Sequence, residues 1–192
     1  GAMYRAAAAI MIDRGISIDV SDTLVAVVAD ADLHFDWAKD PPTMLAWLKP
    51  IDSRIRAADV TAIVSRVASI GRLREHMVQK QRIIARQHPR LVSEGRDQGS
   101  VVFPDATLKF YLDADAQVRA RRRADQLRAD GITVDEAKLL REIIERDRSD
   151  MSRTDGPLVK PANAVVLDTS TLRRQEVVEE LEKIVRRKAD EP

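Results

Sequence analysis

The spacing of apolar residues along the first half of the chain is mostly helical. Apolar positions three and four residues apart predict helices from Tyr4 to about Asp13, after Ser21, and from Ala57 to Gln87 with a break at Gly71. Ser21 is a candidate N-cap of the second helix. Residues 33–55 hold both tryptophans and the prolines of Asp40-Pro41-Pro42, which predicts a short hairpin or an irregular insert.

The second half alternates short apolar runs with longer helical patterns. The runs predict strands at about 91–94, 108–112 and 164–168, and the helical patterns predict helices at about 115–130, 134–153 and 171–188. Strands that alternate with helices are typical of an α/β fold built on a parallel sheet. The length of 192 residues predicts one domain over residues 1–192.

Composition narrows the class of protein. Hydrophobic residues make up 44% and charged residues 33%, which suits a soluble protein with one sizeable core. The absence of cysteine excludes a disulfide scaffold, a cysteine zinc site and a thiol nucleophile. No apolar stretch reaches the roughly 18 residues of a membrane span, so we expect a cytoplasmic protein without a membrane partner.

The charges are balanced in sign but unevenly composed. The net charge is +1, which gives no general attraction to nucleic acid or to an anionic membrane. Arginine supplies 24 of the 32 cations, and its planar fork binds phosphate in a way that lysine cannot. A GC-rich genome gives the same bias, so both explanations stay open.

Two short clusters could carry chemistry. Residues 94–100 follow a predicted strand and place Arg96 and Asp97 at the edge where parallel sheets bind ligands. Arg146, Asp150 and Arg153 are spaced to share one face of a helix, where two guanidiniums could hold an anion and the carboxylate a hydroxyl. The alternatives are a polar turn and ordinary surface ion pairs.

A third cluster, Arg119, Arg122 and Arg123, shares one face of the next predicted helix. It could be a phosphate clamp, a nucleic-acid patch or simply a solvated face. Aromatic residues are not interleaved with these arginines, which argues against binding of single-stranded nucleic acid.

These clusters and their order resemble the bacterial cytidylate kinases, a branch of the nucleoside monophosphate kinases. The most specific match is Glu94-Gly95-Arg96-Asp97-Gln98-Gly99-Ser100 with the six residues after it. The resemblance continues nearly end to end through Gly1-Ala2-Met3-Tyr4-Arg5, Ile55-Arg56, residues 64–68, Leu73-Arg74, residues 119–123, residues 146–153, Pro157-Leu158 and residues 167–170. It implies a three-layer P-loop kinase fold with a parallel sheet.

The resemblance also implies roles for single residues. Four arginines match those that surround the acceptor and transferring phosphates: Arg5, Arg96, Arg146 and Arg153. Phosphoryl transfer needs such neutralisation of charge rather than a covalent residue, so we expect Arg96, Arg146 and Arg153 to be catalytic.

The nucleoside is implied to be read by a second set. Ser65, Arg74 and Asp97 match residues at the cytosine edge, Asp150 matches a contact to the sugar hydroxyls, and Tyr4 lines the same pocket. A carboxylate such as Asp97 favours cytosine, because cytosine presents an amino donor where uracil presents an acceptor.

The remaining implied parts concern the donor and the moving segments. Arg122 matches an arginine on the ATP side, and ATP and Mg²⁺ are the implied cofactors, without a protein metal site. Residues 33–75 match the nucleoside monophosphate-binding insert and residues 134–157 the lid. The implied protein is a monomer when complete and does not bind nucleic acid.

The sequence departs from the family pattern in one major way. The family begins with a strand, a glycine-rich phosphate loop ending in Gly-Lys and a helix, yet none of the seven glycines here is followed by lysine. We therefore expect a fragment that lacks the first strand, a deliberately trimmed chain, or a natural form that lost the loop. Loss of an interior strand predicts exposed sheet edges and self-association. The insert at 33–55 also lacks the expected glycine hairpin.

The predicted activity is transfer of the γ-phosphoryl group of ATP to CMP or dCMP, with little turnover by these residues alone. The alternatives are a non-catalytic nucleotide-binding fragment and an arginine-rich module that binds nucleic acid. Steep loss of oligonucleotide binding with salt is the signature of the last alternative.

Overall fold

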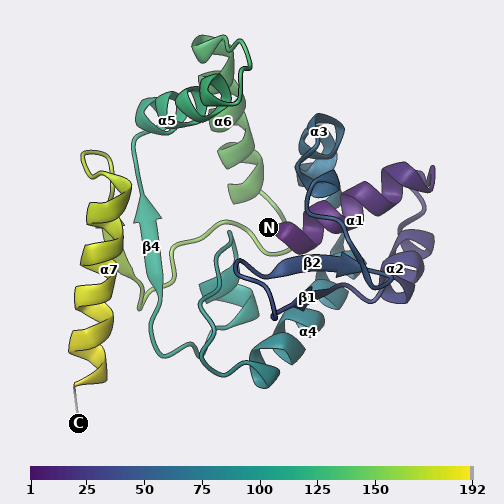
Figure 1. The fold of residues 1–192 in the computed structure, drawn as a ribbon, viewed down its shortest axis with the longest axis horizontal. Coiled ribbons are helices and arrows are strands. Elements are labelled where there is room, and N and C mark those ends of the chain that lie inside the picture. The colour runs from purple at the N-terminus through teal and green to yellow at the C-terminus, as the bar shows by residue number, and fades with distance from the viewer. Residues whose placement is uncertain (191–192) are drawn as a thin grey trace. The chain divides into compact units, whose positions relative to one another are not determined.

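A computed structural model describes residues 1–190, and the chain divides into two compact units (Figure 1). The first unit contains residues 1–103 and 153–157, and the second contains residues 104–152 and those after 157. No helix within residues 1–190 is long and apolar enough to cross a membrane.

The first unit is mainly helical, with a small antiparallel sheet. In chain order its elements are α1 (Ala2–Asp13), α2 (Ser21–Asp30), β1 (His34–Asp36), β2 (Thr43–Ala46), β3 (Lys49–Pro50), the 3₁₀ turn η1 (Arg54–Arg56), α3 (Ala58–Val67), α4 (Gly71–Gln87) and the π-helical turn η2 (Gln98–Val102).

Helix α1 forms the centre of the first unit. It contains four consecutive alanines, Ala6 to Ala9, all buried, and alanine is the strongest helix former. Small side chains let a neighbouring helix approach closely, and α3 and η1 pack against α1. The buried apolar residues of α2, α3 and α4 complete one continuous core around it.

The insert predicted at 33–55 is an antiparallel sheet of three strands in the order β1-β2-β3. The turn between β2 and β3 has positive φ at Trp47 (47°) and Leu48 (60°), the geometry of a type I′ hairpin. Non-glycine residues tolerate it here because Trp47 is anchored. Its indole Nε1 donates to Asp30 (2.8 Å) and its backbone N donates to the Ala31 carbonyl (2.7 Å). The missing glycine therefore does not prevent a hairpin.

The second unit contains the parallel sheet. Its elements are β4 (Phe110–Asp113), α5 (Ala116–Ala129), α6 (Glu136–Met151), β5 (Val165–Asp168) and α7 (Arg174–Ala189). β4 and β5 pair in parallel from Phe110↔Val165 to Asp113↔Asp168, with α5 and α6 in the connection. The predicted α/β class with a parallel sheet is confirmed.

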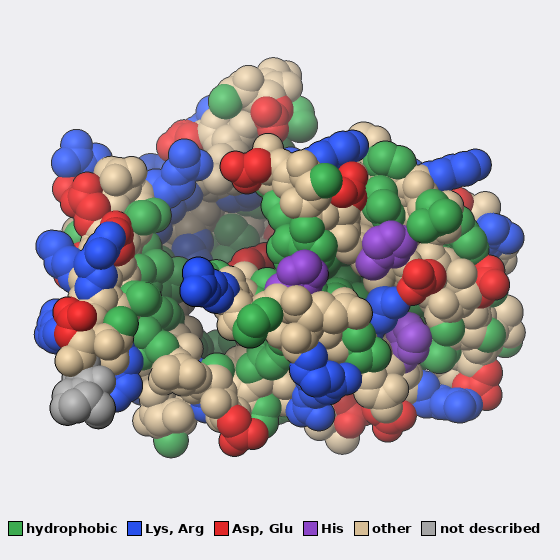
Figure 2. Space-filling view, turned by 60° about the horizontal axis from the view of Figure 1, so that its bottom comes forward, with side chains coloured by type: hydrophobic (Ala, Val, Ile, Leu, Met, Phe, Trp, Pro, Cys, Tyr) green, Lys and Arg blue, Asp and Glu red, His purple; other side chains and the backbone are tan. Residues whose placement is uncertain are grey.

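Both strands of this sheet keep apolar side chains exposed. Leu112 is 53% exposed and Val166 is 48% exposed, and they point to opposite faces because adjacent register positions alternate. Hydrophobic side chains are visible on the left of the space-filling view, where Figure 1 places β4, β5 and α7 (Figure 2).

Three local predictions are wrong. Residues 91–94 form no strand, because a strand needs a hydrogen-bonded neighbour and β4 and β5 pair only with each other in residues 1–190. Ser21 is the first residue of α2 rather than its N-cap, which is Val20 without a side-chain bond. Helix α6 ends at Met151, so Arg153 lies beyond the helical face of Arg146 and Asp150.

Candidate functional site

A buried ion pair forms the centre of the candidate site in the first unit. Arg74, in the first turns of α4, pairs through its Nη2 nitrogen with the carboxylate of Asp97, the residue before η2. The two residues are 5% and 4% exposed. The Nη1 nitrogen of Arg74 donates to the Ala68 carbonyl at the end of α3 (2.9 Å). Pairing and hydrogen bonding make burial of both charges tolerable.

Tyr4 lies against this pair. Its ring is 5.3 Å from the guanidinium carbon of Arg74, a cation–π contact. Its buried hydroxyl has no hydrogen-bond partner among the described residues. Burial raises the pKa of Tyr4 to about 12, with Asp97 acting in the same direction and Arg74 and Arg153 opposing it. A buried donor beside a charged pair suits a polar ligand.

Residues 153–157 pack onto the same pair. Gly156 has φ +59°, and a Cβ at this position would overlap the guanidinium of Arg74. A Cβ at Gly71 would lie 2.9 Å from a carboxylate oxygen of Asp155. Sequence reasoning missed Gly156, although the turn-forming run Asp155-Gly156-Pro157 marks it. Glycine is required at position 156 because its positive φ and the close approach of the Arg74 guanidinium both exclude a side chain.

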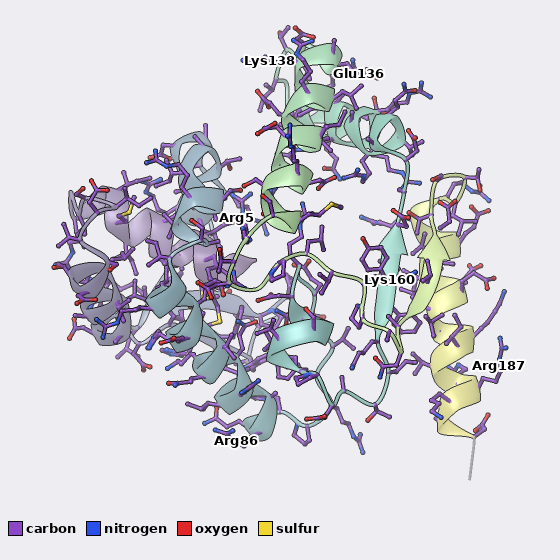
Figure 3. All side chains as sticks on the ribbon, turned by 180° about the vertical axis from the view of Figure 1, so that it is seen from behind. Arg5, Arg86, Glu136, Lys138, Lys160 and Arg187 are labelled. Atoms are coloured by element: carbon purple, nitrogen blue, oxygen red, sulfur yellow. The ribbon has the colours of Figure 1, made fainter. Side chains whose placement is uncertain are left out.

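The other predicted residues of the first unit lie on α1, on α3 and in the segment before η2. Arg5, labelled in Figure 3, donates from Nη1 to the Ile55 carbonyl (3.2 Å) and to Thr61 Oγ1 (3.0 Å). Ser65 lies half-buried on α3, and Arg96 precedes Asp97 in the turn before η2. Thr61 is a contact that sequence reasoning missed, since nothing in the local pattern distinguishes it from a surface threonine.

The second unit carries the other three predicted residues. Arg146 Nε lies 3.9 Å from a carboxylate oxygen of Asp150, which is only 1% exposed. Arg122 donates to the Thr169 hydroxyl (3.2 Å) and to the Leu172 carbonyl (2.8 Å), just after β5. These contacts hold the Arg122 guanidinium at the carboxyl end of the sheet, where parallel sheets place their ligands.

Helices α5 and α6 also share a charged contact. Arg119 Nη1 donates to the Asp147 carboxylate (2.5 Å). A hollow of about 520 Å³ adjoins this pair and is lined by Arg119, Ile144, Asp147, Arg148, Met151 and Ser152. Ile144 and Met151 are the apolar residues of this lining, and the other four residues are charged or polar.

The structure thus brings together Tyr4, Arg74, Asp97 and the segment that begins with Arg153, all within the first unit. Arg146, Asp150 and Arg122 belong to the second unit. Within residues 1–190, no group of three or more His, Asp or Glu residues could hold a metal ion.

Comparison with known proteins identifies the family. The family model for cytidylate kinase matches residues 1–187. A cytidylate kinase of Methylococcus capsulatus is 43% identical over 179 residues, which cover 93% of this chain and 80% of that protein. A cytidylate kinase of Escherichia coli K12 is 37% identical over 188 residues, covering 98% and 82% respectively. One of Erwinia tasmaniensis is 38% identical over 179 residues, covering 93% and 78%. The chain belongs to the cytidylate kinase family.

Proposed function

We propose that this protein transfers the γ-phosphoryl group of ATP to CMP or dCMP and that the Arg74–Asp97 pair reads the cytosine. The family supports the reaction, and one observation carries the assignment of the base site. A buried carboxylate held by a buried guanidinium, beside a buried tyrosine hydroxyl with no partner in residues 1–190, offers polar groups of both kinds to a base.

The discrimination follows from hydrogen-bond chemistry. The carboxylate of Asp97 has lone pairs beyond the one that faces Arg74, and these accept from the amino group of cytosine. Uracil places a carbonyl oxygen there, which repels the carboxylate and leaves the lone pairs that face the base without a donor. Tyr4 donates its hydroxyl proton to the same ligand, because its pKa of about 12 keeps it protonated at neutral pH.

The phosphates are handled by arginines. In this proposal Arg5, Arg96, Arg146 and Arg153 neutralise the acceptor and transferring phosphates, and Asp150 accepts from the sugar hydroxyls. The contacts of Arg5 to Ile55 and Thr61 involve its Nη1 nitrogen and fix the orientation of its planar guanidinium. Residues 33–75 form the nucleoside monophosphate-binding insert and residues 134–157 the lid.

The donor is proposed to bind beside Arg122. ATP would enter with Mg²⁺, which would offset part of the triphosphate charge when bound. We propose a cytoplasmic monomer that acts on free nucleotides. Binding of nucleic acid is disfavoured because Arg119 and Arg122 on α5 are engaged with Asp147 and with the residues after β5.

Binding of CMP and UMP tests this function. Titration calorimetry should give a clear preference for CMP, and Asp97→Asn should erode it, since an amide can present either its donor or its acceptor to the base. Equal affinities for the two nucleotides in the unmutated protein would refute the assignment.

The phosphate role is tested separately with cytidine and CMP. Arg153→Lys replaces a bidentate fork with a point charge, so it should weaken CMP and spare cytidine. Equal weakening of both would show that Arg153 is not a phosphate ligand.

A further inference from the structure

Helix α4 holds the segment around Asp97 at three points. Arg74 pairs with Asp97, Gln81 accepts a hydrogen bond from Gln98, and Arg82 donates to the carbonyls of Val102 (2.9 Å) and Val101 (2.8 Å). Figure 3 shows η2 beside α4 in the first unit. One rigid helix therefore sets the position of the whole turn that carries the base-reading carboxylate.

The three α4 residues lie on one stripe of the helix. Positions 74, 81 and 82 are separated by seven and eight residues, which is two turns of an α-helix. Arg82 satisfies the carbonyls that η2 leaves open at its C-terminal end. Apart from the pair that Asp97 itself forms with Arg74, the contact at Gln98 is the one nearest in sequence to Asp97.

Each of the two glutamine amides forms hydrogen bonds through both its nitrogen and its oxygen. Gln98 Nε2 donates to Gln81 Oε1 (2.9 Å), and Gln98 Oε1 accepts from Ser93 Oγ (2.6 Å). Gln81 Nε2 donates to the Met77 carbonyl (3.2 Å). Because every link has a defined donor and acceptor, the chain of bonds fixes the direction of both side chains.

The backbone passes this constraint to Asp97. The Asp97 carbonyl accepts from the amides of Val101 (2.9 Å) and Val102 (3.1 Å), so Asp97 and Gln98 together start η2. Gly95 adds to the packing, because a Cβ there would lie 3.0 Å from the Gln98 side chain.

We propose that Gln98, held by Gln81, is a positioning residue for base discrimination. It touches no base itself. It fixes the start of η2 so that the Asp97 carboxylate stands where it accepts from cytosine and repels uracil. This inference rests on the proposed function of the site and adds the residues that set its selectivity.

The donor and acceptor pattern gives an isosteric test. Gln98→Glu keeps the acceptor for Ser93 but sets an oxygen against Gln81 Oε1. Gln81 can bond this oxygen only by turning its amide, which gives up the bond to the Met77 carbonyl, so the chain of bonds is disrupted. Gln81→Met removes the acceptor from the α4 side and leaves the Asp97 turn unchanged in sequence. Gln81→Glu keeps an acceptor for Gln98 and is the conservative variant. Gln79→Met, at an exposed position of α4, is the matched control.

The measured quantity is the ratio of the UMP to the CMP dissociation constant, obtained by calorimetry on the full chain. We expect Gln98→Glu and Gln81→Met to lower this ratio about fivefold to tenfold, the effect of one hydrogen bond. Gln81→Glu should retain most of the ratio and Gln79→Met all of it. Melting temperatures measured on the same samples separate loss of folding from loss of selectivity.

The outcomes distinguish the two proposals. If the unmutated protein prefers CMP and Gln98→Glu and Gln81→Met keep that preference, the positioning role is overturned and the proposed function stands. The role is also overturned if Gln81→Glu lowers the ratio as much as Gln81→Met. If the unmutated protein shows no preference for CMP, the proposed function fails and this inference fails with it.

Discussion

The two units of the chain use similar helices and strands but bury them very differently. The first unit contains nearly all of the buried apolar residues, with α1 packed on all sides. In the described part of the second unit only Ala120 and Ala124 are buried apolar residues, and α7 buries none. The charged pair at the proposed base site lies in the well-packed unit.

This difference links packing to recognition. A buried ion pair discriminates between bases only if its surroundings cannot relax, and a close-packed core provides that rigidity. Parallel sheets normally have both faces covered, whereas Leu112 and Val166 leave both faces of the β4–β5 sheet partly open. Local opening should therefore be easier in the second unit, since resistance to opening follows buried apolar area.

The largest expected effect separates binding from turnover. None of the glycines in the 192 residues is followed by lysine, so these residues contain no Gly-Lys phosphate-loop motif to hold the donor phosphates. We expect this polypeptide to bind CMP through the first unit. It should form CDP at least about a thousandfold more slowly than a version extended by a strand–phosphate loop–helix segment.

The measurement is ATP-dependent formation of CDP by both proteins, with CMP affinity measured in parallel. Comparable turnover would mean that another part of these residues cradles the donor phosphates. The expected separation of CMP binding from turnover in these residues would then be wrong.

Breaking the buried pair should give the next largest effect. Arg74→Leu leaves the Asp97 carboxylate buried without its cation, which should lower the free energy of unfolding by about 3–5 kcal/mol. Lys183→Met removes one side of an exposed pair with Glu180 in the second unit and should leave the free energy of unfolding nearly unchanged. Urea unfolding is followed by tryptophan fluorescence, which reports on the first unit because Trp37 and Trp47 both belong to it, and by circular dichroism, which reports on the helices of both units. Similar losses for both variants would contradict the comparison.

Truncation of apolar side chains should show the same contrast at smaller size. Met77 is fully buried, so Met77→Ala should cost about 2–5 kcal/mol, whereas Leu112→Ala at a 53% exposed position should cost less than about 1 kcal/mol. Urea unfolding followed by both fluorescence and circular dichroism checks each unit. A larger loss for Leu112→Ala would mean that the β4–β5 sheet is covered in solution.

The same contrast explains which sequence predictions succeeded. Helices with long apolar periods, and the strands at 110–113 and 165–168, were predictable because their patterns are local. A strand at 91–94 was wrongly predicted because pairing depends on a neighbour that the local pattern does not specify. Arg153 was assigned to a helical face by spacing, but the helix ends two residues before it.

The candidate site was predictable in part. The family motif pointed to Arg74 and Asp97, but their direct pairing joins residues 23 positions apart and becomes visible only in the fold. Gly156 and the Gln81–Gln98 link were missed for the same reason, since a contact between distant elements leaves no local periodicity. The assignments of the individual site residues stay predictions until the binding experiments are done.

The smallest expected effect concerns Tyr4 and alkaline pH. Its pKa of about 12 in the folded protein lies above the ordinary value of 10.0, chiefly because the phenol is buried. Between pH 10 and pH 12 the unfolded chain releases a proton that the folded chain keeps, so this contribution to stability is complete below pH 10 and is lost as the pH rises toward 12. Tyr4→Phe removes it. The free energy of unfolding of the unmutated protein should therefore fall relative to that of Tyr4→Phe by up to about 2–3 kcal/mol over this range, since one pKa unit corresponds to about 1.4 kcal/mol.

Near pH 7 the substitution should be close to neutral for stability, because the hydroxyl it removes has no partner among the described residues. Urea unfolding at several values between pH 9 and pH 11.5 measures the slope, with Tyr111→Phe in β4 as the control for loss of a hydroxyl from the other unit. A difference between the unmutated protein and Tyr4→Phe that stays constant with pH would mean that the phenol of Tyr4 is open to water, and the tight packing proposed for the base site would then be wrong.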